Sequence, residues 1–372
     1  MQVFGHLRAV SPPGIGIPGP ARPILQVIEE AYSIFDHWMR LNHLLLFSFI
    51  PSSALQLSWL IHVLVSAFNT HFMLASRLHL PPTARGIFVS GGSLTSIIVA
   101  RNAILAPNDY PRALIYIGDQ IRKVPSDDSC RMRVRALRKQ IQDGKAKGLF
   151  PFLIVGTFGC TGSGAIDPRK ELSDITKEEN LWLYVDGAYG ASAALSHSRH
   201  QTASELGYAD SVAWDEHEWL LQTYGCGMLF DRGKPNLTRD KAEFWGLGLE
   251  LTRPARTMSL WFTLRVLGTE RTRKMTDHRI NLVEPLQRQL EVLPDWEILT
   301  LASLAILNFR YEPVGRSDEK VDLVNLELSR RFIERNIAAI MTVEIRRVAL
   351  RVRCRNTRLR VEDMVNLIRT LT

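Results

Sequence analysis

Cysteine is scarce in this sequence: its 372 residues contain four, and no two of them form a C-x-x-C pair. This spacing indicates neither a disulfide framework nor a zinc site, and it is typical of proteins in a reducing compartment. We therefore expect a cytoplasmic protein without a structural metal. The four cysteines are Cys130, Cys160, Cys226 and Cys354.

The sequence also lacks an uninterrupted apolar run of membrane-spanning length. Its most apolar stretch, 44–68, contains Pro51, Gln56 and His62, which favours a buried helix. Residues 1–23 carry five prolines where a signal peptide needs an unbroken apolar core. We therefore expect a flexible leader there, no membrane partner and no secretion.

What is present fits a soluble globular chain, with 46% hydrophobic and 23% charged residues. This balance excludes a disordered chain, a collagen and a small disulfide scaffold. The 46 basic and 38 acidic residues give a net charge of +8, which raises the question of nucleic-acid binding. The densest basic cluster, 346–360, partly alternates apolar and basic residues over 348–354, as a half-exposed strand does. We therefore expect no nucleic-acid partner.

Short apolar runs alternate with helical or polar segments in the middle of the chain. The connections are expected at 94–102, 131–147 and 174–179. Apolar strands separated by helices favour a parallel sheet covered on both faces. The predicted strands are Gly86–Val89, Ala113–Ile117, Phe152–Thr157, Leu181–Val185 and Ser211–Trp214.

The chain as a whole divides into four predicted parts. A proline-rich and glycine-rich leader, 1–23, precedes an N-terminal helical segment, 24–82, and a large domain, 83–258. Residues 259–372 form a linking helix and a small C-terminal domain. There, the helical stretch 260–293 leads to a strand, a helix, a strand and a helix.

Two turns rich in glycine and hydroxyl groups follow predicted strands. Ser90–Ser93 precedes a helix, where backbone N–H groups and a hydroxyl suit a phosphate, although a tight connection explains the same residues. The second turn, Val155–Gly162, is either an ordinary glycine turn or a binding loop. Neither turn alone establishes a function.

Two further strands end on polar residues. Asp186 closes an apolar strand, where open α/β sheets bind ligands, although a helix-capping aspartate is the alternative. The next strand runs into Asp215-Glu216-His217-Glu218-Trp219. We expect no metal site there, because neighbours along a strand point to opposite faces.

Taken in order, these segments resemble the group II pyridoxal-phosphate-dependent amino-acid decarboxylases, which include the aromatic amino-acid, histidine and glutamate decarboxylases. The resemblance runs from about Ile24 to Thr372. It implies an α/β, aspartate-aminotransferase-like (fold type I) large domain with a mostly parallel sheet, plus a small C-terminal α+β domain. The matching segments are His43–Pro51, Ser90–Ser93, Gly156–Asp167 (the family's G-T-x-G-T-T-x-x-G-A-x-D), Leu183–Tyr189 (L-H-V-D-A-A-Y) and Leu350–Asp363.

The resemblance also implies roles for individual residues. Asp186 would pair with the pyridinium nitrogen of pyridoxal phosphate, and Ala188 would lie against the ring face. In this family the active site forms at the interface of a homodimer, to which His43 would contribute on the substrate side. The residues implied for the phosphate are Gly92, Ser93 and His217, and Thr161 would be a nearby hydrogen-bonding group.

One position departs from the family. Where its motif reads N-P-H-K-W and the lysine carries the cofactor as a Schiff base, this chain reads Asp215-Glu216-His217-Glu218-Trp219. Glu218 thus occupies the lysine position, and a carboxylate cannot form an imine. Placed beside the cofactor, it would oppose the bound phosphate and favour a cation.

Three other family features lack a counterpart in the sequence. The substrate-side segment is missing after Asn69-Thr70, and no ring-stacking histidine follows Gly118-Asp119-Gln120. The mobile loop with the family's catalytic tyrosine has no clear counterpart between Asp231 and Phe244, and Tyr224 lies upstream of that gap.

Three functions fit this pattern. The first is a carboxy-lyase-like protein repurposed for lysine-independent acid–base chemistry on a small molecule derived from an amine or amino acid, with Glu218, His217 and Asp186 as catalytic groups. The second is a lyase that binds pyridoxal phosphate or pyridoxamine phosphate without a covalent link. The third is a catalytically inactive homologue that serves as a partner subunit. The substrate and the presence of any cofactor stay open.

Overall fold

A computed structural model describes most of the second half of the chain and parts of the first. The described residues are 21–29, 77–81, 84–89, 92–117, 122–222, 227–232, 256–334, 340–354, 360, 362 and 366. Several predictions concern residues outside these ranges, namely His43, the stretch 44–68, Asn69-Thr70, Ser90-Gly91, Gly118-Asp119-Gln120, Tyr224 and 233–244.

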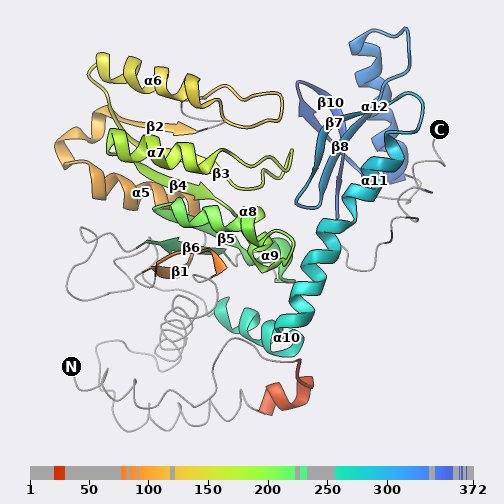
Figure 1. Cartoon of the computed structure of the whole chain (residues 1–372), viewed down its shortest axis with the longest axis horizontal. Coiled ribbons are helices and arrows are strands. Elements are labelled where there is room, and N and C mark those ends of the chain that lie inside the picture. Colours follow the sequence, from red (N-terminus) through yellow and green to blue (C-terminus); the bar gives the residue numbers. More distant parts are fainter. Residues whose placement is uncertain are drawn as a thin grey trace.

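The larger sheet has six strands in the order β1-β6-β5-β4-β3-β2 (Figure 1). The pairs β2–β3, β3–β4 and β4–β5 are parallel, whereas β6 lies antiparallel between β1 and β5. The mostly parallel sheet predicted from the sequence is therefore confirmed. Its strands are β1 Arg85–Val89, β2 Ala113–Ile117, β3 Phe150–Thr157, β4 Trp182–Asp186, β5 Ser211–Asp215 and β6 Gly227–Asp231.

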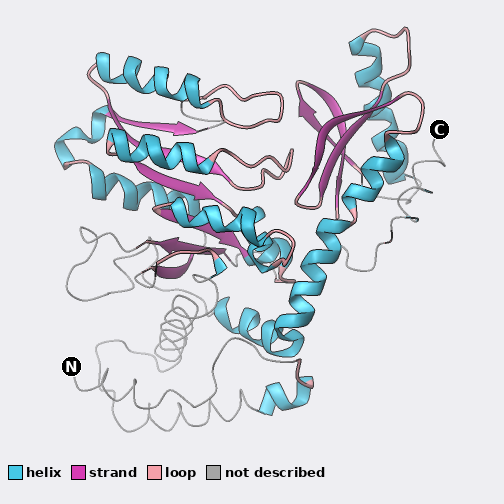
Figure 2. Cartoon of the chain, in the orientation of Figure 1, coloured by secondary structure: helices cyan, strands magenta, loops and turns pink. Residues whose placement is uncertain are grey.

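Helices cover both faces of this sheet, as Figure 2 shows. Successive side chains of a strand point to opposite faces, so Leu153 and Val155 pack with α5 on one face, while Ile154 packs with α6 and α7 on the other. Both faces are apolar, as expected of a buried parallel sheet. The helices around the sheet are α5 Gly92–Ile104, η2 Pro107–Arg112, α6 Val134–Ala146, α7 Arg169–Glu179, η3 Gly190–Leu195, α8 His200–Ser204, η4 Glu205–Tyr208 and α9 Glu216–Trp219.

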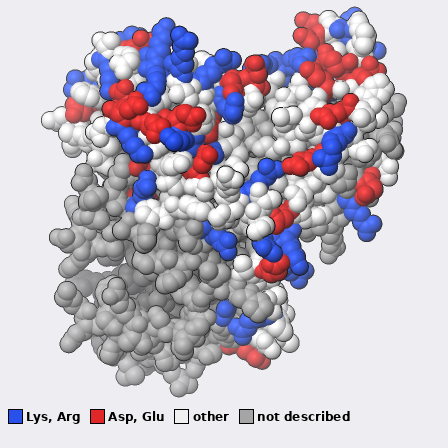
Figure 3. Space-filling view, in the orientation of Figure 1, with Lys and Arg blue, Asp and Glu red and all other residues white. Residues whose placement is uncertain are grey.

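The outer faces of α6 and α7 carry charges of both signs. Arg138 pairs with Glu178, and Lys145 pairs with Glu179, so that ion pairs link the two helices. On the face seen in Figure 3, basic and acidic side chains are interspersed over the described surface. Within the described residues, no helix combines the length and apolar character that a membrane crossing requires.

A second, smaller sheet is formed by the C-terminal part of the chain. Its four strands are antiparallel in the order β7-β8-β10-β9, and α11 and α12 pack against it. The helix α10 connects the two regions, and its path breaks at Gly268, whose φ of 69° and ψ of 167° are not helical (Figure 1). The elements are α10 Arg256–Asn281, α11 Val283–Leu290, β7 Trp296–Ser303, β8 Ile306–Tyr311, α12 Asp318–Glu334, β9 Met341–Ile345 and β10 Arg347–Arg353.

The small sheet contains two hairpins where the sequence predicted two single strands. Leu304 and Ala305 join β7 to β8, and both have positive φ, as a two-residue type I′ hairpin requires. Asn-Gly or Asp-Gly is the usual signal for such a turn, so Leu-Ala conceals the hairpin in the sequence. The predicted strand at 348–354 is confirmed as β10. The division of the chain into four parts stays a prediction.

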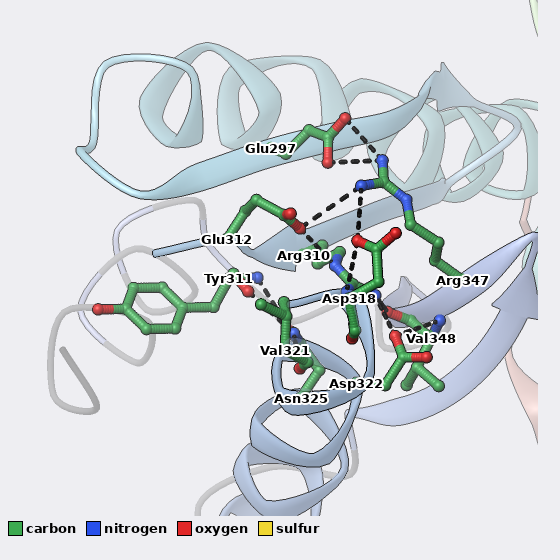
Figure 4. A network of polar contacts seen from close by, with 10 residues as sticks. All are labelled: Glu297, Arg310, Tyr311, Glu312, Asp318, Val321, Asp322, Asn325, Arg347 and Val348. Atoms are coloured by element: carbon green, nitrogen blue, oxygen red, sulfur yellow. Dashed lines mark hydrogen bonds and ion pairs between the residues drawn. The ribbon is translucent and has the colours of Figure 1, made fainter. Parts of the chain in front are cut away.

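A buried arginine organises the packing of α12 on the small sheet (Figure 4). The side chain of Arg310 is fully buried, and its guanidinium pairs with Glu312 and Asp322. It also donates hydrogen bonds to the carbonyl oxygens of Val348, at 2.9 Å, and Asp318, at 3.2 Å. These contacts connect β8 with the start of α12 and with β10, so the buried cation joins three elements.

We expect Arg310→Met to destabilise the protein by about 1–3 kcal/mol, because it leaves buried carbonyl oxygens without a donor. Denaturant unfolding followed by circular dichroism measures the loss. Arg330→Met is the matched control, since the pairs that Arg330 forms along α12 with Glu327 and Glu334 are exposed, and this variant should show no measurable change. Equal losses in both variants would contradict a structural role of Arg310.

Candidate functional site

Polar side chains gather where β4 and β5 end at the same edge of the large sheet. Asp186 is the last residue of β4, and Asp215 is the last residue of β5. The backbone of Ala188 links them: its N–H donates to Asp186 Oδ1 at 3.1 Å, and its carbonyl oxygen accepts the N–H of Asp215 at 3.0 Å. The carboxyl edge of the parallel strands, where such sheets bind ligands, thus holds two neighbouring carboxyl groups.

His217 and Glu218 approach Asp215 because the chain turns into the short helix α9 at Glu216. His217 Nε2 lies 3.8 Å from Asp215 Oδ2 and 4.0 Å from Glu218 Oε1. The side chains of His217 and Glu218 are each 16% exposed. The premise that these neighbours lie on a strand and point apart is therefore wrong. The described residues nevertheless contain no group of three or more histidine, cysteine or acidic side chains arranged to hold a metal ion.

Burial raises the pKa of both aspartates above the usual value. For Asp186, burial outweighs the hydrogen bond from the Ala188 N–H, which lowers the pKa. For Asp215, burial raises the pKa, His217 lowers it, and the charges of Asp186 and Glu218 raise it further. Carboxyl groups of this kind can exchange protons at a higher pH than exposed ones, which suits acid–base chemistry.

Tyr184 connects the start of α5 with this cluster. Its hydroxyl lies 2.9 Å from Ser93 Oγ, and it stands two residues before Asp186 on β4. Burial raises the pKa of Tyr184 well above the usual value, and the charges of Asp186 and Asp215 act in the same direction. Ser93 follows Gly92, the first residue of α5. The helix N-terminus, a ready anion site, therefore lies beside the strand that carries Asp186.

An arginine of the small sheet forms an ion pair with a member of this cluster. Arg353, at the end of β10, pairs with Glu218 of α9. Its guanidinium lies 5.0 Å from the ring centroid of Tyr189, whose hydroxyl donates to the carbonyl oxygen of Leu304 at 2.7 Å. The candidate site is therefore built from both parts of the chain.

The second glycine loop also meets the small sheet. The Thr161 carbonyl oxygen accepts a hydrogen bond from Arg351 Nη1 at 2.9 Å, and the Gly164 carbonyl oxygen accepts one from Ser303 Oγ at 2.8 Å. Gly164 has a φ of 73°, and a Cβ there would lie 2.7 Å from the Ser303 carbonyl oxygen, so this position requires glycine. The described contacts of this loop thus dock one sheet on the other.

The structure brings most of the predicted site residues to one edge, and their roles stay predictions. Asp186, Ala188, His217 and Glu218 lie together, and Ser93 joins them through Tyr184. Sequence reasoning did not assign roles to Tyr184, Asp215, Tyr189 or Arg353. Asp215 directly follows the predicted strand Ser211–Trp214, as Asp186 follows Leu181–Val185, and this parallel could have identified it. No sequence signal pairs Arg353 with Glu218.

The side chains present fit a pyridoxal-type ring and phosphate. A partly buried carboxyl, Asp186, suits a ring nitrogen, and Gly92 and Ser93 at the start of α5 suit a phosphate. An imine needs a lysine, and every lysine in the described part of the chain is exposed. Those lysines are Lys123, Lys139, Lys145, Lys147, Lys170, Lys177, Lys274 and Lys320.

Comparison with known families and proteins gives a consistent result. The family model described as the pyridoxal-dependent decarboxylase conserved domain matches residues 111–312, more than half of the chain. The aromatic-L-amino-acid decarboxylase of Bacillus atrophaeus is 32% identical over 335 residues, covering 79% of this chain and 70% of that enzyme. The rat enzyme of the same name is 27% identical, and the match covers 69% of this chain and 59% of the rat enzyme.

Solved structures share the fold. The match to the Catharanthus roseus tryptophan decarboxylase in complex with L-tryptophan has a TM-score of 0.75 at 19% identity. The match to the Oryza sativa TDC with PLP and tryptamine has a TM-score of 0.76 at 18% identity. Both matches cover 100% of this chain and 86% of the other chain. The expected fold type I architecture with a small C-terminal domain is therefore confirmed.

We expect Asp186→Asn to stabilise the protein at pH 7. The raised pKa means that the native state binds more protons than the unfolded chain, so wild-type stability falls as the pH rises from about 4 through the folded pKa. Asparagine removes this penalty and still accepts the Ala188 N–H. Thermal melts at pH 7 and at pH 4 should show a gain that disappears at the lower pH.

Asp143→Asn provides the control, because Asp143 lies exposed on α6. It should give the same melting temperature as the wild type at both pH values. A pH-independent effect of Asp186→Asn would contradict the burial cost of this carboxylate.

Proposed function

Because the chain belongs to the pyridoxal-dependent decarboxylase family, we propose that it is a carboxy-lyase-like enzyme that acts on a small molecule derived from an amine or amino acid without a lysine Schiff base. In this proposal Glu218 stands at the position of the family's lysine. The observation that carries the proposal is the convergence of Asp186, Asp215, His217 and Glu218 at one edge of the large sheet.

The site favours an ammonium group and can move protons. At an effective dielectric near 20, two unit charges about 4 Å apart interact by roughly 4 kcal/mol, so a carboxylate cluster attracts a cation strongly. His217 lies within 4.0 Å of carboxylate oxygens of both Asp215 and Glu218. We assign His217, Glu218 and Asp186 to proton transfer, and Asp215 to holding the ammonium of the substrate.

The same residues support a cofactor bound without a covalent link. A pyridoxal-type ring supplies an electron sink for a carbanion. Asp186 would hold its ring nitrogen, Ala188 would lie against the ring, and Thr161 would be a neighbouring group. Gly92, Ser93 and His217 would hold the phosphate. Pyridoxamine phosphate would fit this proposal better than pyridoxal phosphate, because a carboxylate at 215 or 218 would favour its ammonium.

We further propose that the chain forms a homodimer, as the resemblance implies, and that it lies in the cytoplasm, as its few, widely spaced cysteines indicate. The alternative of an inactive partner subunit is favoured by one observation: the carboxylate of Glu218 is already engaged by Arg353. A protein that melts cooperatively but binds no vitamer and turns over no amine would support this alternative over an enzyme.

Vitamer binding tests the cofactor proposal. We expect pyridoxamine 5′-phosphate to quench tryptophan fluorescence saturably, and Asp186→Ala to weaken its binding about tenfold or more through loss of a charge-assisted hydrogen bond. Borohydride treatment after addition of pyridoxal 5′-phosphate should leave no stoichiometric label on a single lysine in peptide mass spectrometry. One fully labelled lysine would contradict lysine-independent binding.

Turnover tests the catalytic proposal. The wild-type protein is incubated with amines and amino acids, with and without each vitamer, and the products are followed by mass spectrometry. Glu218→Gln should lower turnover about 100-fold or more, the range for loss of a general acid or base. Glu178→Gln, an exposed carboxylate on α7, should retain wild-type turnover. Undiminished turnover in Glu218→Gln would contradict the catalytic role of Glu218.

A further inference from the structure

An ion pair between the two sheets lies inside the candidate site. Arg353 belongs to β10 of the small sheet, and Glu218 belongs to α9, which follows β5 of the large sheet. Their side chains are 17% and 16% exposed, so water screens the pair only in part. The residues lie 135 positions apart in the sequence, and only the packing of the two sheets brings them together.

The surroundings of Arg353 hold its guanidinium in place. One face lies over the ring of Tyr189, with 5.0 Å between the guanidinium carbon and the ring centroid, which is a cation–π contact. That ring is itself fixed by the hydrogen bond of its hydroxyl to Leu304 and by contact with Trp219, at a centroid distance of 5.3 Å. The guanidinium thus has an aromatic partner and an anionic partner, both supplied by the large-sheet region.

The pair also sets the charge next to the other acidic groups. Glu218 raises the pKa of Asp215, and its Oε1 lies 4.0 Å from His217 Nε2. When Arg353 compensates the negative charge of Glu218, that charge raises the pKa of Asp215 less than an uncompensated carboxylate would. A lysine at position 218 would instead face Arg353 with a like charge, so the acid at 218 and the guanidinium at 353 suit each other.

We propose that Arg353 is a positioning residue of this site: it fixes and charge-compensates the Glu218 carboxylate, so that the site is assembled only when the small sheet is docked. This inference rests on the proposed function for the chemistry of Glu218. The ion pair itself can be tested on the protein without any ligand.

A double-mutant cycle measures the coupling between the two side chains. Arg353→Gln and Glu218→Gln should each lower the melting temperature by about 3 °C or more, and the double variant should lose no more than the worse single variant. The charge-reversed double variant, Glu218→Arg with Arg353→Glu, should recover part of the loss. Additive losses in the cycle would overturn the proposal.

A second ion pair between the same two regions serves as the control. Arg346 pairs with Asp128, but the two side chains are 59% and 84% exposed. The same cycle with Arg346→Gln and Asp128→Asn should show no measurable coupling, because exposed pairs contribute little. Coupling as large as that of the buried pair would show that general docking, and not the site, accounts for the effect.

The titration of Asp215 distinguishes charge compensation from simple packing. The charges that act on Asp215 are those of His217 and Glu218 on α9 and Asp186 on β4. Tyr184 on β4, whose pKa Asp215 raises, and Arg353 on β10, which pairs with Glu218, are the other neighbouring groups. Carboxyl carbon-13 NMR of aspartate-labelled protein, assigned with Asp215→Asn, follows its midpoint. Arg353→Gln should move the midpoint to higher pH, Glu218→Gln should move it to lower pH, and Arg353→Lys should leave it near the wild-type value.

The outcomes separate this inference from the proposed function. Coupling together with the opposed shifts of Asp215 supports the role of Arg353, even if no vitamer binds and no amine is turned over. An unchanged Asp215 midpoint in Arg353→Gln overturns it, even if the protein proves to be an active enzyme. If Arg353→Gln fails to fold, Glu218→Gln still decides the question: an Asp215 midpoint that does not move to lower pH in this variant overturns the inference.

Discussion

Keeping carboxyl groups partly away from water is the constraint on which the site depends. Asp186 and Asp215 end adjacent strands, and burial opposes the charge of both. The strands β4 and β5, which carry these aspartates, are packed with apolar residues on both faces. The aspartates therefore cannot move fully into water unless the strands separate and the apolar core is lost. The stability of the sheet thus offsets the cost of keeping these carboxyl groups partly away from water.

The docking of the two sheets is the second requirement. The small sheet reaches the large one through backbone carbonyl oxygens, at Thr161 and Leu304, and through the Arg353–Glu218 ion pair. Apolar residues of both regions also belong to one continuous core, which includes Ile154 and Phe309. A side chain on β10 can therefore set the electrostatics of a cluster that sequence position alone would assign entirely to the large domain.

Patterns in short stretches of sequence predicted the strands and the residues that end them, because burial of each strand depends on its own apolar residues. Apolar runs located β1 to β5 to within two residues, and Asp186 was found because it ends such a run. The hairpin at Leu304-Ala305 was missed because its turn lacks the usual residues, and β6 was missed because an antiparallel strand inserted between two others has no distinct pattern. The Arg353–Glu218 pair depends on tertiary packing, which no periodicity in the sequence records.

The position of β6 also orders the events of folding. β1 and β5 have no direct pairing, and each forms its hydrogen bonds with β6 on opposite sides. Among the described strands β1 pairs only with β6, so during synthesis it cannot join the sheet before residues 227–231 exist. The β1 edge therefore forms only through contacts that are distant in the sequence, and such contacts slow folding.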